Sequence, residues 1–154
     1  MALSRAFCAI AGLCFAGAGS ALAQGQDLGP GLDLAPAERI QALSTGLSAT
    51  VVQSGSRNDA AILQSGASNY ARAEQSGWTN QVVLQQIGAL NTAEVYQSGS
   101  YNSVNISAIG TANRATVEQV GNCNSAEIQQ TGTLLNVVVR QYGDYSRTRV
   151  FQFQ

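Results

Sequence analysis

Residues 91–102 read NTAEVYQSGSYN, and this pattern returns every 11 residues between residues 46 and 154. Three of its positions are nearly constant: a glutamine, a glycine two residues later and an asparagine five residues later, as at Gln97, Gly99 and Asn102. Self-similarity at a short fixed period indicates stacked repeat units, each of which needs its neighbours to bury an apolar face. The function of such a chain is expected in the whole stack and not in a pocket.

The constant positions recur with few exceptions. Ala108 replaces the glutamine once, Leu135 and Ser146 replace the asparagine, and Gln154 stands where a glycine is expected. The glutamines are Gln53, Gln64, Gln75, Gln86, Gln97, Gln119, Gln130, Gln141 and Gln152. The glycines are Gly55, Gly66, Gly77, Gly88, Gly99, Gly110, Gly121, Gly132 and Gly143. The asparagines are Asn58, Asn69, Asn80, Asn91, Asn102, Asn113 and Asn124.

Residues within each unit alternate in character. After Asn91, the residues Ala93, Val95 and Gln97 share one parity, and more polar residues take the other. Alternation with a period of two predicts a β-strand with one buried face. The three-residue step from glycine to asparagine breaks the parity, and both residue types favour turns. Each unit is therefore predicted to be one strand and one turn.

Buried amides decide how these strands are arranged. An inward glutamine or asparagine costs about 1–3 kcal/mol unless its amide is hydrogen-bonded. If two strands face each other across a thin core, a coil contains two repeat units and residue i lies over residue i+22. The amides then form ladders of the kind that stabilise cross-β structure. We predict an all-β fold: a cross-β, amyloid-like β-solenoid of five two-strand, 22-residue coils.

Opposite charges recur at the same spacing on the outward positions. Stacked opposite charges stabilise neighbouring strands by a few tenths to about 1 kcal/mol, and exposed pairs contribute little. Such pairs therefore indicate the register of neighbouring strands more than they stabilise the fold. Three such pairs are separated by one coil: Arg72 with Glu94, Glu118 with Arg140, and Glu127 with Arg149.

The first 45 residues carry no repeat. Residues 1–23 are predicted to be a signal peptide, because Arg5 precedes an apolar stretch and residues 21–23 form a small-residue cleavage site. The apolar stretch is shorter than the ~20 residues of a membrane-spanning helix. Residues 24–45 contain both prolines and are predicted to be a nonrepetitive leader or export segment, with a helical turn or two over residues 37–43. Residues 46–154 form the repeat domain.

Composition argues against several classes of function. The mature chain has no lysine or histidine, and seven arginines face nine carboxylates. It therefore lacks both a clustered basic face for nucleic acid and the commonest general base and metal ligand. The carboxylates fall on outward positions and do not converge, which argues against an enzyme on a β-helix. We predict no catalytic residue, no metal site and no cofactor. Cys123 is the single mature cysteine, and it either stays a free thiol or crosslinks neighbouring subunits.

The signature Asn-x-Ala-x-(Ile/Val)-x-Gln-x-Gly, repeated behind a signal peptide and a leader, resembles that of the curlin family. These proteins are the subunits of curli, which are bacterial extracellular amyloid fibres. The resemblance implies a solenoid that stacks end to end, secretion across the outer membrane to the cell surface, and a role in biofilm matrix and adhesion. The implied partners are further copies of the chain, another curlin subunit, and the outer-membrane curli export pore with its accessory factors. The repeated glutamines and asparagines are then the candidate self-assembly residues.

The last coil differs from the others. Arg140, Arg147 and Arg149 against Asp144 give residues 140–154 a net charge of +2, whereas residues 24–139 carry −4. Within the resemblance, a divergent basic terminal repeat is similar to that of the minor, nucleating subunit, so these arginines are candidate anchoring or nucleation residues. The major fibre subunit is the alternative. An uncapped solenoid end is expected to polymerise. A secreted nonamyloid β-solenoid adhesin is the other function that the repeat allows.

Overall fold

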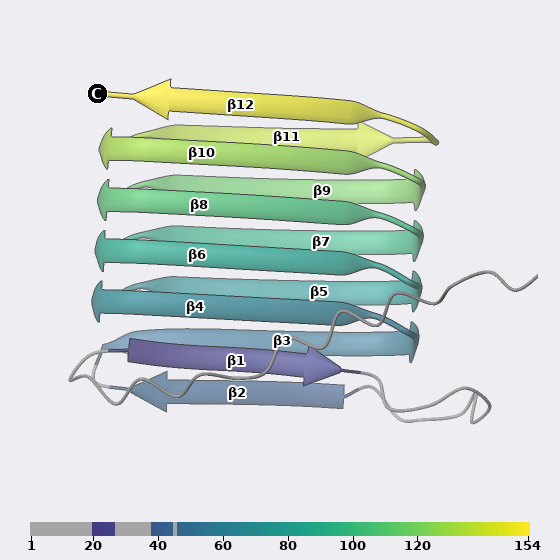
Figure 1. The fold of residues 1–154 in the computed structure, drawn as a ribbon, viewed down its shortest axis with the longest axis horizontal. Coiled ribbons are helices and arrows are strands. Elements are labelled where there is room, and N and C mark those ends of the chain that lie inside the picture. Colours follow the sequence, from purple (N-terminus) through teal and green to yellow (C-terminus); the bar gives the residue numbers. More distant parts are fainter. Residues whose placement is uncertain (1–19, 27–37, 45) are drawn as a thin grey trace, which may run out of the picture.

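The computed structural model describes residues 20–26, 38–44 and 46–154, which form two facing six-stranded sheets (Figure 1). The strand order is β1-β4-β6-β8-β10-β12 in one sheet and β11-β9-β7-β5-β3-β2 in the other. The described residues contain no helix, and hence none long and apolar enough to cross a membrane. The strands are β1 (Ser20–Gln26), β2 (Glu38–Ser44), β3 (Leu47–Ser56), β4 (Asp59–Ala67), β5 (Tyr70–Trp78), β6 (Gln81–Ala89), β7 (Thr92–Ser100), β8 (Ser103–Thr111), β9 (Arg114–Asn122), β10 (Ser125–Thr133), β11 (Asn136–Tyr142) and β12 (Arg147–Phe153).

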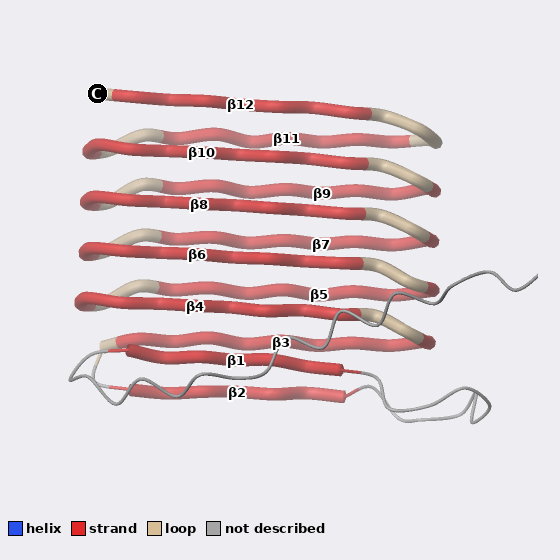
Figure 2. Tube along the Cα trace, in the orientation of Figure 1, coloured by secondary structure: helices blue, strands red, loops and turns tan. Residues whose placement is uncertain are grey.

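The strands from β3 to β12 confirm the predicted solenoid. Successive strands lie in alternate sheets and are joined by short turns (Figure 2). Within each sheet these strands are parallel, and residue i pairs with residue i+22, as Gln75 does with Gln97 and Gln97 with Gln119. Ten strands therefore make five two-strand coils, each one 22-residue step along the chain.

The core is a thin layer between the two sheets. On β4 the inward residues Ala60 and Ile62 are fully buried, and on β6 Val82 and Leu84 are at most 1% exposed. Small and branched side chains fill this layer because facing sheets pack only ~10 Å apart. The predicted inward parity of the alanine, aliphatic and glutamine positions is confirmed along the repeat.

Each turn contains two residues in the left-handed region. Gly99 has φ 119°, and a Cβ there would lie 2.0 Å from the carbonyl oxygen of Gly121 in the next coil. Glycine is thus required both for its φ and for the close approach of the coils. The residue before each asparagine also has a positive φ, even where it is the β-branched Thr79 (φ 56°). That conformation is rare for such residues, and sequence reasoning did not locate it because the position is variable.

The leader is strand and not helix where the structure describes it. β2 pairs antiparallel with β3, so the helical turn predicted over residues 37–43 is wrong for residues 38–43, and residue 37 lies outside the described residues. The open edge of β3 offers backbone hydrogen-bond partners, and these outweigh a weak local helical preference. β1 pairs antiparallel with β4 and crosses the predicted cleavage site after residue 23. Residues 1–19 of the predicted signal peptide lie outside the described residues, and the segment boundaries stay predictions.

Replacing Gly99 by alanine is expected to destabilise the fold more than replacing Gly143. Both glycines have a positive φ, but an added Cβ at Gly143 meets no atom of the described residues within 4 Å. Gly143→Ala should therefore cost only the left-handed strain of about 1–2 kcal/mol. Gly99→Ala adds a clash with the backbone of the next coil. The denaturation midpoint of this variant, measured by circular dichroism, should therefore fall further than that of Gly143→Ala. Equal midpoints would contradict the close coil approach.

Candidate functional site

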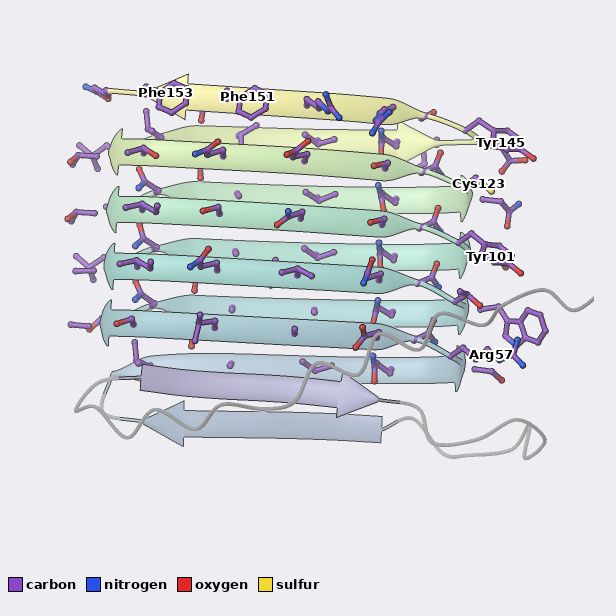
Figure 3. The ribbon with its side chains drawn as sticks, in the orientation of Figure 1. Arg57, Tyr101, Cys123, Tyr145, Phe151 and Phe153 are labelled. Atoms are coloured by element: carbon purple, nitrogen blue, oxygen red, sulfur yellow. The ribbon has the colours of Figure 1, made fainter. Side chains whose placement is uncertain are left out.

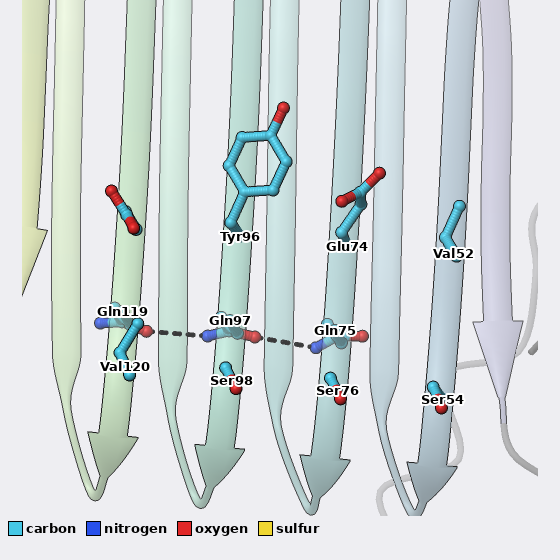
Figure 4. A pocket seen from close by; sticks show the side chains of 11 residues that line it. Val52, Ser54, Glu74, Gln75, Ser76, Tyr96, Gln97, Ser98, Gln119 and Val120 are labelled. Atoms are coloured by element: carbon cyan, nitrogen blue, oxygen red, sulfur yellow. Dashed lines mark hydrogen bonds between the residues drawn. The ribbon is translucent and has the colours of Figure 1, made fainter.

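The inward glutamines form hydrogen-bonded ladders along the solenoid axis. In the complete ladder, the Nε2 of every glutamine but the last donates to the Oε1 of the glutamine one coil further on, at 2.6–3.0 Å. Figure 4 shows the part of this ladder from Gln75 to Gln119. Its glutamines are at most 4% exposed. The cost of burying these amides is thus offset by pairing. The members of this ladder are Gln53, Gln75, Gln97, Gln119 and Gln141.

The same amide groups tie the two sheets together. Gln97 Nε2 also donates to the backbone oxygen of Gln81, which lies on the facing sheet, at 3.2 Å. Gln75 Nε2 does the same to Asp59, at 3.1 Å. One side chain therefore joins neighbouring coils and opposite sheets, and an aliphatic residue in its place would lose both sets of hydrogen bonds.

The second ladder is interrupted at Ala108. Gln64 donates to Gln86 at 2.7 Å and Gln130 to Gln152 at 2.9 Å, but Ala108 lies between these two pairs. As a result Gln130 Oε1 is buried without a hydrogen-bond partner among the described residues. A buried acceptor of this kind costs about 1–3 kcal/mol.

The asparagines form a different kind of ladder. Asn80 Oδ1 accepts the backbone N–H of Asn102 at 3.1 Å, and Asn102 Nδ2 donates to the backbone oxygen of Gly121 at 2.8 Å. Each asparagine therefore fastens its own turn to the neighbouring coils through the backbone. The ladders end at Leu135 and Ser146, whose N–H groups are accepted by the last asparagines but whose side chains do not continue the pattern.

The predicted residues occupy equivalent places in every coil. All seven asparagines of the repeat are buried, and so are its glutamines except Gln152 in the last strand. The nine turn glycines have positive φ values throughout. The repeat thus brings the predicted glutamines, glycines and asparagines together as columns along the axis, one of which is interrupted at Ala108.

Two of the three expected charge pairs form ion pairs. Arg140 contacts Glu118 at 3.4 Å, and Arg149 contacts Glu127 at 3.0 Å. Two of the three candidate anchoring arginines are thus paired within the chain. Arg147 is exposed, and none of the ion pairs among the described residues involves it.

The third expected pair is stacked but not bonded. Arg72 lies in register with Glu94, as predicted. Its guanidinium instead contacts Glu74 on its own strand, which raises the pKa of Arg72, and Glu94 pairs with Arg114 at 3.1 Å. Residues two apart on a strand share a face, so a long arginine side chain reaches either partner. The register was therefore predicted correctly, and the bonding partner was not.

A groove of about 340 Å³ runs along the axis on the outer face of β3, β5, β7 and β9 (Figure 4). Tyr96 stands in it between Glu74 and Glu118, and burial and Glu94 raise the pKa of Tyr96. Both groove carboxylates are already held by arginines. In the part of the chain that the structure describes, no three histidine, cysteine, aspartate or glutamate residues gather as metal ligands do.

Variable residues line one edge of the stack at the turns. Figure 3 shows Arg57, Tyr101, Cys123 and Tyr145 in one column there. Arg57 lies over the ring of Trp78, 5.3 Å from its centre, which is a cation–π geometry. Cys123 is a half-buried free thiol. These side chains lie on the outside of the turns and do not belong to the glutamine or asparagine ladders.

Restoring the interrupted ladder should stabilise the protein. In Ala108→Gln, the new amide would accept from Gln86 and donate to Gln130 Oε1, which removes an unpaired acceptor worth about 1–3 kcal/mol. The expected result is a higher denaturation midpoint. Ser107→Gln is the matched control, because it adds the same side chain to the outer face of the same strand. An equal rise of the denaturation midpoint in Ser107→Gln and Ala108→Gln would contradict this explanation.

The comparison with known families agrees with the geometry. Residues 45–77, 88–121 and 109–132 match the curlin associated repeat, and together these segments cover half of the chain. No curated protein and no solved structure matches the sequence significantly. The matched segments contain most of the ladder glutamines, turn glycines and turn asparagines described above, whereas Asn80, Gln86, Gln141, Gly143 and Gln152 lie outside them. The chain belongs to the curlin family.

Proposed function

We propose that this protein is a structural subunit of extracellular curli-type amyloid fibres, which serve in biofilm matrix and adhesion. The observation that carries the proposal is the complete glutamine ladder, which runs along the stacking axis through all five coils. A ladder of this kind is not specific to one chain, because a further rung adds the same hydrogen bonds whichever molecule supplies it. Membership of a fibre-forming family supports the same conclusion.

The family also suggests the protein's route and partners. In this proposal the chain crosses the outer membrane through the curli export pore with accessory factors and assembles at the bacterial cell surface. Its partners are further copies of itself and another curlin subunit. The curlin repeat is a structural module, and the proposal assigns no reaction to the chain.

The chain from Gln24 onward, refolded at neutral pH, is expected to form unbranched fibres that bind amyloid dyes. Fibre diffraction should show a meridional spacing of about 4.7–4.8 Å, the distance between hydrogen-bonded strands. A stable, soluble, β-rich monomer would instead support the nonamyloid adhesin.

Matched substitutions test whether the ladder drives this assembly. Gln97→Leu/Gln119→Leu removes two neighbouring rungs and should slow fibre formation. Gln85→Leu/Gln129→Leu makes the same change on the outer face, where neither residue is fully buried, and should have little effect. Equal slowing by the two double substitutions would show that the inward amides have no special part in assembly.

A nucleating or anchoring role is the second candidate. The last coil loses asparagine at Leu135 and Ser146, and it carries Arg140, Arg147 and Arg149. Because Arg140 and Arg149 are paired with glutamates of the preceding coil, Arg147 is the arginine that remains for an acidic partner. This role concerns the tether between fibre and cell and does not change the fibre fold.

Deleting residues 135–154 separates the two roles. The remaining four coils keep the 22-residue register and should still form fibres. In the producing bacterium, however, fibres of a nucleator lacking this coil should detach from the cell surface and fail to seed the partner subunit. Normal attachment and seeding would assign the chain to the major subunit.

A further inference from the structure

We infer that the edge formed by β3 and β4 is the docking surface for the β11–β12 end of a second copy, and that β2 of the leader, with the part of β1 that cleavage leaves, occupies this surface until that copy displaces it. The inference rests on the proposed fibre function and specifies its junction. It defines which residues meet, which way the chains point and what covers the junction beforehand.

The strand register carries over from one copy to the next. Asp59 is followed at 22-residue steps by Gln81, Ser103, Ser125 and Arg147, which form one column on the outer face. Among the described strands, β11 and β12 are outermost at one end of the two sheets. If the coils of a second copy continue this stack in the same register, Asp59 of that copy lies one coil beyond Arg147.

Charge is complementary at this junction. The column begins with the half-buried carboxylate of Asp59, ends with the exposed guanidinium of Arg147, and is uncharged between them. Four coil steps separate the two residues, about 19 Å at the usual strand spacing, so they do not pair within one chain. In a stack of two copies they become neighbours. Burial also raises the pKa of Asp59, which agrees with a carboxylate that gains from a cationic partner.

The inward residues match in the same register. Gln64 Oε1 is buried and has no hydrogen-bond partner among the described residues, at the end of the stack where its ladder begins. Ladder bonds run from Nε2 to the Oε1 one coil further on, so Gln152 of the preceding copy would donate to this oxygen. Val150 would lie over Ile62 by the same step. Head-to-tail stacking therefore continues the direction of the amide bonds across the junction.

The leader strands pair with the same edge. β2 is antiparallel to β3 from Glu38 opposite Gln53 to Ser44 opposite Leu47, and β1 is antiparallel to β4. An edge strand accepts only one partner on its open side, so docking of a second copy and pairing of the leader exclude each other. Cleavage at the predicted site would remove residues 20–23, which lie opposite residues 62–65 of β4. β2 is then the larger cover that a second copy must displace.

Cross-seeding between charge-swapped chains tests the junction. In fibres made of the Asp59→Arg/Arg147→Asp chain alone, opposite charges still meet at every junction between copies. At a junction between this chain and a wild-type chain, two like charges meet. Seeds and monomers of the same type should elongate alike, whereas mixed combinations should elongate about fivefold more slowly. Equal rates in all four combinations would overturn the register. If wild-type chains form no fibres at all, the proposed function fails instead.

A proline pair tests the leader. Successive N–H groups along a strand point to opposite sides, so either Ile40 or Gln41 directs its N–H toward β3. The double substitution Ile40→Pro/Gln41→Pro therefore removes one hydrogen-bond donor that faces β3. The mature chain with this change should show a shorter lag before fibre growth, with the elongation rate on preformed seeds changed less. Leu34→Pro, in the leader but outside β2, is the control. An unchanged or longer lag, or an equal shortening in the control, would refute the displaced cover.

Discussion

The hydrogen bond from one buried glutamine amide to the next is the interaction on which the rest of this structure depends. A glutamine such as Gln97 inside a core of alanine and valine is unfavourable unless both ends of its amide are paired. Two facing sheets with a 22-residue coil place an identical amide directly above and below it. Any slip of one residue along a strand would move these amides to the outer face, so the ladder also fixes the register.

Glycine and asparagine depend on the same register. Gly99 approaches Gly121 so closely that no Cβ fits, and Asn102 reaches the Gly121 carbonyl from the turn. Both contacts join one coil to the next and are lost together if the coils shift. Local turn chemistry, core packing and amide pairing therefore favour one arrangement, which is the agreement across levels that marks a foldable sequence.

In the proposed fibre, a structure held together along one axis interacts through its two ends. The outer faces of the sheets carry ion pairs such as Arg149 with Glu127 and a shallow groove beside Tyr96, and these differ from coil to coil. The inward columns repeat almost without change. The outer surface therefore varies from coil to coil, while the inward columns supply the repeated contacts along the axis.

The 11-residue repeat alone was enough to predict the inward parity, the two-strand coil and the 22-residue step, because period and burial are encoded in every unit. It also located the break at Ala108, but only the structure shows that Gln130 Oε1 is left unpaired there. Tertiary structure likewise decided that Arg72 contacts Glu74, that the residue before each asparagine is left-handed, and that residues 38–44 form a strand. These outcomes depend on neighbours that are far apart in the sequence or on turn geometry, and both are set only once the coils are stacked.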